Sequence, residues 1–425
     1  MARTLTPLDG YTIMNALVEQ MTGQSSVTAT DISSYISAGE TVMQSGIENV
    51  FNALSIVTFR TYFGVRPYKR KFSLINALDT GAYSSRFSKI SFYSKQALPS
   101  GYFNTDQFTN LADGYTNGQN PSGTPPTPNS TKSMWEQNQA MPLMMNFGGS
   151  TVWDQCITIY EKQIAAAMRD PQELANLVSS MITEHENDIE SEREAFDRMI
   201  VLSKIASIYD YATNHSLMTE SAVDLTAAFN AFYSTSYTGA QLRSTYLKEF
   251  LAFMVATIKE YSDYLTERGT MYHLPMTKTV GGVNYNILRH TPRDRQRLML
   301  YSPLFRKAES LVLPEIFHDD LLRMDQYEAV SYWQSNASDT DRPAIDIQTS
   351  IYDSGTGLQI QGAQVKLDYV VGILYDADSM MSDWQLDSAY TTPIEARKGY
   401  RNTWLHIAKN AINDPTENAI LFYMS

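Results

Sequence analysis

The sequence predicts an α+β protein, because long one-sided helical patterns alternate with short apolar runs that are typical of strands. No Gly or Pro interrupts Gln172–Asn214, and apolar residues recur on one side of it. Two apolar runs bounded by polar residues, Tyr369–Tyr375 and Ala419–Met424, predict strands buried on both faces. The 425 residues exceed the ~250–300 at which one core stops growing, so two or more lobes are expected.

Composition and charge exclude several function classes. The formal net charge of −13 argues against a duplex-binding surface over the whole molecule, because neutralising phosphates needs clustered Lys and Arg. The single cysteine, Cys156, rules out an internal disulfide and a Cys-rich zinc site, which suits a reducing cytosol. The N-terminus lacks an apolar signal-peptide stretch, and no apolar run approaches ~18–20 residues. We therefore expect a protein that is neither secreted by that route nor inserted in a membrane.

The first 57 residues predict an arm of short helices that forms no core by itself. Residues 58–98 then change to strand-like, aromatic and basic sequence. Between Arg60 and Lys95 there are eight Lys and Arg residues and one acid, Asp79. Residues 99–141 have the Gly and Pro content of a flexible loop, and strand character returns at Trp153 and Cys156–Tyr160. Strand, flexible tip and strand together predict a large β-hairpin.

The long helix has clear start signals. Asp170 suits the N-cap, Pro171 suits the first helical position, and Glu173 follows the cap by three residues. At ~1.5 Å per residue, an unbroken helix here is a rod of roughly 60 Å. Acidic residues alternate with other residues along it, namely Glu184, Glu186, Asp188, Glu190, Glu192 and Glu194. Alternate residues lie ~200° apart on a helix, so a metal site is disfavoured and a solvated or partner-facing segment is favoured.

Mixed structure is expected after the long helix. An apolar seam from Leu247 to Leu265 predicts a second good helix. The pattern then predicts a strand at Leu298–Tyr301, a helix from Leu304 to about Phe317, strands near Glu328–Trp333 and Ile345–Tyr352, and a turn at Asp353–Gly357. A break at Thr391–Pro393 precedes the segment Tyr400–His406 and the closing strand.

No catalytic, cofactor or metal constellation emerges from the residues. The six histidines lack metal-ligand spacing. Asp376 and Asp378 follow a predicted strand, where α/β enzymes place catalytic groups, but a cap for a helix at Ser379–Met381 is the favoured interpretation. For Cys156, a buried and inert thiol is expected.

The order of pieces resembles the major capsid proteins of tailed bacteriophages, the Hong Kong 97 fold. The resemblance covers essentially the whole chain by order of elements. The resemblance is most specific in the last third of the chain, where four segments look like those of capsid proteins of small short-tailed phages. These segments are Thr291–Leu300, the Leu304–Phe317 helix, Val370–Asp376 and Tyr400–His406. The resemblance implies an N-terminal arm at 1–57, an extended loop at 58–168 with its tip at 99–141, a peripheral domain with a spine helix at 169–215, an axial domain at 216–390, and returning peripheral strands at 391–425.

The function that the resemblance implies is a structural one. Copies of the chain are expected to form the hexamers and pentamers of an icosahedral shell that encloses double-stranded DNA without sequence-specific binding. A separate scaffolding protein and a portal protein at one vertex are the implied partners, with no cofactor and no membrane. The implied location is the virion, assembled in the cytoplasm of a bacterial host. The alternatives are an encapsulin-type compartment shell and, less favoured, an α+β enzyme that uses Asp376 and Asp378.

Two further expectations concern contacts. We hypothesise that the basic hairpin meets the acidic helix of a neighbouring copy, through Lys69, Arg70 and Lys71 facing Glu186, Glu190 and Glu194. Because termini usually fray, an apolar run at Ala419–Met424 predicts that this end closes a core. We expect it to complete the sheet that begins after the hairpin, beside the long helix and outside the later lobe.

Overall fold

The computed structural model describes residues 11–12, 14–16, 18–19, 29–44, 72, 74–77, 86–94, 140–148, 151–162, 170–280, 283–311, 327–353 and 357–425. The chain divides into two compact units. The first contains Met1–Phe87, Asn146–Leu274 and Arg289–Ser425, and the second contains Ser88–Met145 and Pro275–Leu288. The first unit holds the long helix and two larger sheets, and the second holds short hairpins.

The predicted long helix is confirmed as α5, Pro171–Asn214, with 44 residues. Its start follows from the sequence, because the Asp170 carboxylate accepts a hydrogen bond from the Gln172 N–H at 2.9 Å. Pro171 occupies the first turn, where a missing N–H costs nothing. At ~1.5 Å per residue the helix extends for about 66 Å.

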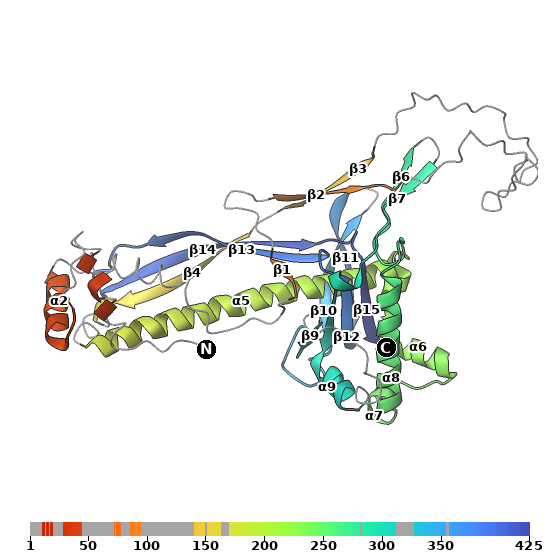
Figure 1. Ribbon diagram of the computed structural model, residues 1–425, viewed down its shortest axis with the longest axis horizontal. Helices are drawn as coiled ribbons and strands as arrows, with labels where there is room; N and C mark the ends of the chain where they lie inside the picture. The colour runs from red at the N-terminus through yellow and green to blue at the C-terminus, as the bar shows by residue number, and fades with distance from the viewer. Residues whose placement is uncertain are drawn as a thin grey trace, which may run out of the picture. The chain divides into compact units, whose positions relative to one another are not determined.

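One sheet lies along α5 (Figure 1). Its order is β1-β13-β14-β4, formed by β1 Asn76–Ala77, β13 Met380–Thr391, β14 Tyr400–Asn413 and β4 Thr151–Tyr160. The pairs β13–β14 and β14–β4 are antiparallel. Buried and half-exposed residues alternate through most of β14, so this strand presents one face to the interior. The predicted strand at Trp153–Tyr160 is confirmed as part of β4.

A second sheet has the order β5-β15-β12-β8-β9. It consists of β5 Ala222–Asp224, β15 Ala419–Met424, β12 Tyr369–Asp376, β8 Gln296–Tyr301 and β9 Tyr327–Val330. After half-exposed Tyr369, every residue of β12 is buried, as expected of a strand covered on both faces. The predicted strands at β8, β12 and β15 are confirmed.

The prediction for the sheet that contains β15 was wrong. The strand pairs antiparallel with β12 and parallel with β5, and therefore lies in the five-stranded sheet and not in the β4 sheet. The strand does lie beside the long helix, as expected. The Tyr423 ring of β15 packs edge to face against the Tyr209 ring of α5, with centroids 5.4 Å apart. Strand character alone does not encode a strand's partners, and both sheets approach the same helix.

Besides the long connection through α5, the chain crosses between these two sheets by two short segments, residues 377–379 and 414–418, and these crossings are bonded to each other. The Asp414 N–H donates to the Ser379 carbonyl at 2.9 Å, and the Asp376 N–H donates to the Asn418 carbonyl at 3.0 Å. The buried Lys204 of α5 donates from Nζ to the Asp414 carbonyl at 2.6 Å. We call these two segments the paired crossings.

Helices and a hairpin complete the first unit. Among the described residues, its further helices include α2 Ile32–Gln44, α6 Leu225–Tyr233, α7 Gly239–Ser244, α8 Leu247–Tyr264 and α9 Ser302–Leu311, with short 3-10 helices at Thr219–Ser221 and Arg293–Arg295. The predicted seam is confirmed in α8, where Leu251, Met254 and Ile258 are buried. The strands β10 Ile345–Asp353 and β11 Leu358–Leu367 pair antiparallel, which confirms a chain reversal near residues 353–357. Much of the arm expected at 1–57, and the end of the helix expected from Leu304 to about Phe317, lie outside the described residues.

The second unit contains short hairpins, and the hairpin predicted from the sequence was wrong in its second strand, because β4, the expected return strand, pairs with β14. The strands β2 Arg86–Phe92 and β3 Pro142–Gly148 pair with each other, and β6 Thr277–Val280 pairs with β7 Val283–Asn286. The Ser94 N–H donates to the Asn286 carbonyl at 2.9 Å, which joins the two hairpins within this unit.

Candidate inter-subunit surfaces

The basic half of the predicted contact lies outside the described residues. This applies to Lys69, Arg70 and Lys71, and also to the side chain of Glu186, although the backbone of Glu186 belongs to α5. The pairing of these groups with a neighbouring copy stays a prediction.

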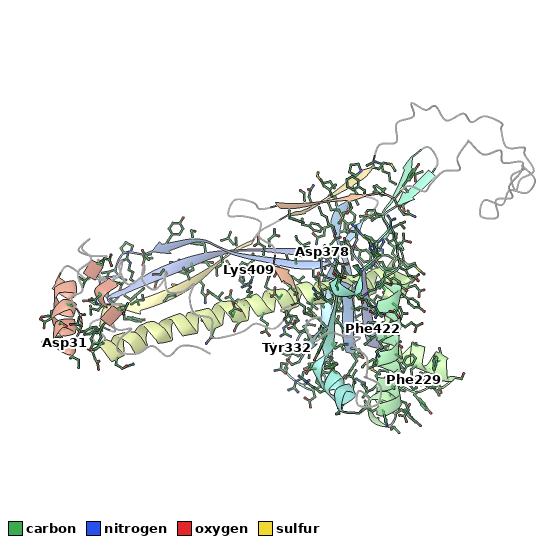
Figure 2. All side chains as sticks on the ribbon, viewed as in Figure 1. Asp31, Phe229, Tyr332, Asp378, Lys409 and Phe422 are labelled. Carbon is green, nitrogen blue, oxygen red and sulfur yellow. The ribbon has the colours of Figure 1, made fainter. Side chains whose placement is uncertain are left out.

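The other two acids of that hypothesis are bound within their own chain. Glu194 is only 8% exposed, and its carboxylate pairs with Arg198 one helical turn later at 2.8 Å. Glu190 is partly buried and lies 3.8 Å from Arg193. The Arg198 guanidinium also stacks 3.7 Å from the centroid of the Tyr332 ring, so it fixes α5 to the loop after β9 (Figure 2). Glu194 therefore has a structural role in this helix.

A buried lysine that was not predicted joins α5 to the sheet. Lys409 of β14 is almost wholly buried, with Nζ 3.3 Å from the Glu192 carboxylate and 3.5 Å from the centroid of the Trp153 ring (Figure 2). Burial lowers the pKa of the Lys409 ammonium, and the hydrogen bond that it donates to the Glu192 carboxylate opposes this change. The alternation of β14 places position 409 on the inward face, which is the one signal that pointed to its burial.

The helix cap predicted at Asp376 and Asp378 is absent, because residues 380–391 form β13. Asp376 is buried and accepts hydrogen bonds from the Thr291 hydroxyl at 2.9 Å and the Asp378 N–H at 2.9 Å. Arg295 binds both carboxylates, at 3.2 Å from Asp376 and in a short contact with Asp378 (Figure 2). The two acids that the enzyme alternative would use thus hold the turn between β12 and β13.

The expectation for Cys156 was also wrong, since the thiol is exposed on β4. Neighbouring positions on this strand, such as Trp153 and Tyr160, are exposed as well. The strand is bonded on one side to β14, and within the described ranges it has no second neighbour. An apolar-looking strand at a sheet edge therefore presents side chains that a central strand would bury.

The β2–β3 hairpin carries an exposed apolar face. Ile90, Phe92 and Met144 are 59%, 60% and 60% exposed. The Tyr93 N–H donates to the Met141 carbonyl at 3.0 Å, and the Phe87 and Phe147 rings stack at 6.4 Å. Both contacts fit one antiparallel register, which sets Ile90 opposite Met144 on the same face. We call Ile90, Phe92, Pro142 and Met144 the hairpin face.

The opposite side of the hairpin is also partly apolar, because Met145 is buried there beside half-buried Phe87 and Phe147. A two-stranded hairpin is marginally stable alone in water, and apolar residues on both sides need covering on both sides. Large contiguous apolar patches on soluble proteins mark interaction sites. The hairpin face is therefore a candidate surface for another protein molecule.

A third exposed surface is aromatic and belongs to the β1-β13-β14-β4 sheet. Tyr390 is strongly exposed and meets the His406 ring edge to face, with centroids 5.4 Å apart. Tyr160 and Tyr400 are adjacent on β4 and β14, at 5.8 Å between centroids. Aromatic side chains are enriched in protein interfaces, because they bury a large area and lose little conformational entropy.

Other kinds of site find no support in the described part of the chain. There, no group of three or more His, Cys, Asp or Glu side chains is arranged to hold a metal ion. Of the helices described, none has both the length and the apolar composition to cross a bilayer.

Comparisons with known proteins give matches of structure and none of sequence. No protein-family model matches the chain, and no curated protein matches it. Among solved structures, the chain is similar to a chain of the capsid of Staphylococcus phage Andhra, with 11% identity and a TM-score of 0.49 over 86% of each chain. It is similar to a chain in the structure of the head fibre and inner core protein of bacteriophage P68, with 10% identity and a TM-score of 0.47 over 85% of this chain and 86% of that one.

A third similar structure is the asymmetric unit of the mature capsid of bacteriophage PhiM1. The identity is 6% and the TM-score 0.41, over 84% of this chain and 88% of that chain. All three solved structures are of parts of bacteriophage particles.

Proposed function

We propose that the chain is the major capsid protein of a tailed bacteriophage, and that copies of it assemble into the closed icosahedral shell around the phage DNA. The observation that carries the proposal is the hairpin face, an exposed apolar surface on a two-stranded hairpin. In a monomer these apolar side chains stay in contact with water, which is unfavourable. In a shell, neighbouring copies of the chain cover them.

The separate exposed surfaces support assembly into a closed array. A closed array of identical chains needs different surfaces that fit one another, because a subunit must contact several neighbours. The hairpin face, the aromatic sheet surface and the exposed edge strand β4 supply such surfaces. The net charge of −13 agrees with a container that has little affinity for the nucleic acid inside it.

The finer assignment follows the Hong Kong 97 arrangement. In this proposal α5 is the spine helix of a peripheral domain at 169–215. Residues 1–57 are the arm, and residues 58–168 are the extended loop. Residues 216–390 form the axial domain, and residues 391–425 are the returning strands of the peripheral domain. A separate scaffolding protein guides assembly, a portal protein occupies one vertex, and assembly takes place in the cytoplasm of the bacterial host. The chain has no enzymatic role.

The first test is expression of the full chain in a bacterial host, followed by purification and negative-stain imaging. We expect closed shells of uniform size. Shells filled with phage DNA during infection support the capsid proposal, whereas shells that hold an enzyme cargo instead support the encapsulin alternative. A stable soluble monomer with a ligand-binding cleft contradicts both.

The basic segment of the hairpin gives a second prediction. Replacing Lys69, Arg70 and Lys71 together by Glu is expected to block shell formation, because the attraction to Glu186 and Glu190 of the neighbouring α5 becomes a repulsion. Exposed ion pairs contribute only ~0–1 kcal/mol each, but a shell repeats them at every subunit. The measurement is the shell yield by sedimentation and imaging.

The matched control is the double variant Arg306→Glu and Lys307→Glu, which reverses a basic pair on the exposed side of α9. Adding Glu186→Lys and Glu190→Lys to the triple variant is expected to restore part of the yield. Glu194 is left unchanged because it binds Arg198. Normal assembly of the triple variant contradicts this contact without contradicting the shell.

A further inference from the structure

The end of α6 presents aromatic side chains to solvent. Phe232 is 71% exposed and Tyr233 is 48% exposed. Their ring centroids lie 5.7 Å and 6.2 Å from that of Phe253 in α8. Buried Phe229 packs beneath, 5.4 Å from Phe253 and edge to face with it (Figure 2). These rings form one cluster whose outer members face water. We call residues 230–238, which carry the outer rings, the α6 tip.

The α6 tip is held in one conformation by Asn230. The Asn230 side chain donates to the Tyr237 carbonyl at 2.8 Å and accepts from the Tyr237 N–H at 2.9 Å. The same amide oxygen accepts from the Thr235 hydroxyl at 2.8 Å. Ser234 takes a left-handed backbone conformation with φ of 54° and donates its N–H to the Asn230 carbonyl. A partner therefore does not have to pay the conformational entropy of ordering this loop.

The base of α6 is anchored to the five-stranded sheet. The Asp224 carboxylate caps the helix by accepting from the Thr226 N–H at 2.9 Å, and it also accepts from the Ser425 N–H at 3.3 Å. The next helix begins with a capping box between Thr238 and Gln241. The exposed rings thus project from a support that is fixed at both ends.

The segment that carries these rings has no charged residue of its own. Leu225–Gln241 contains no Asp, Glu, Lys or Arg, in a chain of which 19% of the residues are charged. The cores of protein interfaces are depleted in charged residues and enriched in aromatic ones. Two copies of a chain with a net charge of −13 repel each other, so they approach most easily where charge is absent.

From these observations we propose that the α6 tip is a contact between copies of this chain, in which the tip of one copy packs against the tip of a neighbouring copy. The inference rests on the proposed function and names a surface by which the shell is built. A basic partner would be drawn to the acidic surfaces of the chain, whereas an uncharged aromatic surface fits a second uncharged aromatic surface.

The size of the surface sets the strength of this contact. An aromatic side chain buries about 150–250 Å². Two rings from each copy therefore bury less than the ~1,200 Å² typical of a stable pair. The tip contact is weak by itself and becomes effective when other contacts in the same array hold the copies together.

Cross-linking tests where the tips lie. In a Cys156→Ser background, Ser236→Cys places one thiol in the α6 tip, and Ser310→Cys places one on α9 as the matched control. A short bismaleimide is expected to link Ser236→Cys copies into covalent dimers in assembled shells, with at least tenfold less product for Ser310→Cys. Shells that form without a Ser236→Cys cross-link overturn the proposal.

Substitution tests whether the apolar contact matters. Phe232→Asp is expected to lower the shell yield about tenfold, while Phe232→Leu, which keeps an apolar side chain, stays within about twofold of the parent. Circular dichroism and thermal unfolding of both variants are expected to match the parent, since Phe232 is mostly exposed. Normal assembly of Phe232→Asp overturns the proposal.

The outcomes separate this inference from the proposed function. If the parent chain forms no shells, the proposed function fails. Cross-linking of the soluble Ser236→Cys chain at high concentration then still tests whether the α6 tips of two copies contact each other. There, more dimer from Ser236→Cys than from Ser310→Cys supports the tip contact, and equal dimer from the two variants overturns it.

Discussion

Removal of Ala419–Ser425 is expected to leave a chain that does not fold. The strand β15 lies inside the five-stranded sheet, between β12 and β5, and Ile420, Leu421 and Phe422 are fully buried. Each such side chain contributes about 1.5–3 kcal/mol on burial. Their sum is comparable with the whole stability of a typical domain, about 5–15 kcal/mol, before the lost hydrogen bonds of two neighbouring strands are counted.

The measurement is the soluble yield and the circular dichroism of the truncated chain. Deletion of Ser425 alone is the control, since it keeps β15 intact. Phe422→Ala gives a graded version, because its ring contacts Tyr261 edge to face at 5.8 Å and its truncation leaves a cavity that costs about 3–5 kcal/mol. A truncated chain that unfolds cooperatively at the parent's temperature would show that β15 is dispensable.

Asp210→Asn is expected to lower the free energy of unfolding by about 1.5–3 kcal/mol at pH 7. The Asp210 carboxylate of α5 accepts from the Thr349 hydroxyl at 2.6 Å, from the Ala363 N–H at 2.9 Å and from Asn214 at 2.7 Å. It therefore fastens the β10–β11 hairpin to the long helix. The approach is close, since a Cβ added at Gly362 would lie 2.1 Å from this carboxylate.

The pH dependence of the stability loss in Asp210→Asn shows whether the negative charge of Asp210 causes that loss. Burial raises the pKa of Asp210, but hydrogen bonds from Thr349, Asn214 and the Ala363 N–H outweigh it and lower the pKa below the usual value. A lowered folded-state pKa gives stability that is present above the unfolded pKa of about 3.9 and is lost as the pH falls through the folded pKa. The difference between the parent and Asp210→Asn should therefore be full at pH 7 and shrink below about pH 4.

Urea unfolding at several pH values measures this difference. The matched control is Asp346→Asn, an exposed carboxylate on the same hairpin whose loss is expected to change stability little. If the Asp210→Asn difference stays constant from pH 7 to pH 3, a structural effect of the amide, and not the charge, explains it.

Local sequence signals predicted much of the fold. The cap at Asp170, Pro171 and the unbroken apolar stripe were enough for α5, and the uniform apolar run was enough for β12. The strand β13 was missed, because Asp376 and Asp378 resemble a helix cap while the following residues are mostly polar. The neighbours of β15 were predicted wrongly, because which strands pair depends on contacts between distant segments.

The candidate surfaces were harder to predict than the fold. The alternating acids were expected on a solvated or partner-facing segment of α5, but Glu194 and Glu192 bind Arg198 and Lys409 of the same chain. The spacing of Glu194 and Arg198 by four residues, which favours an ion pair on one helix, was overlooked. Lys409 was missed because a lysine is rarely buried without a partner, and Glu192 and Trp153 are distant in sequence. The exposure of the α6 tip depends on how α6 packs on α8, which no local pattern contains.

The paired crossings have a mechanical consequence. The two sheets are joined by two short segments that are bonded to each other and, through Lys204 and Asp414, to α5, which itself leads from one sheet to the other. A force applied to the β1-β13-β14-β4 sheet therefore passes to the five-stranded sheet by more than one connection. In a shell under internal pressure, such a joint would spread the load from one neighbour's contact across the whole subunit.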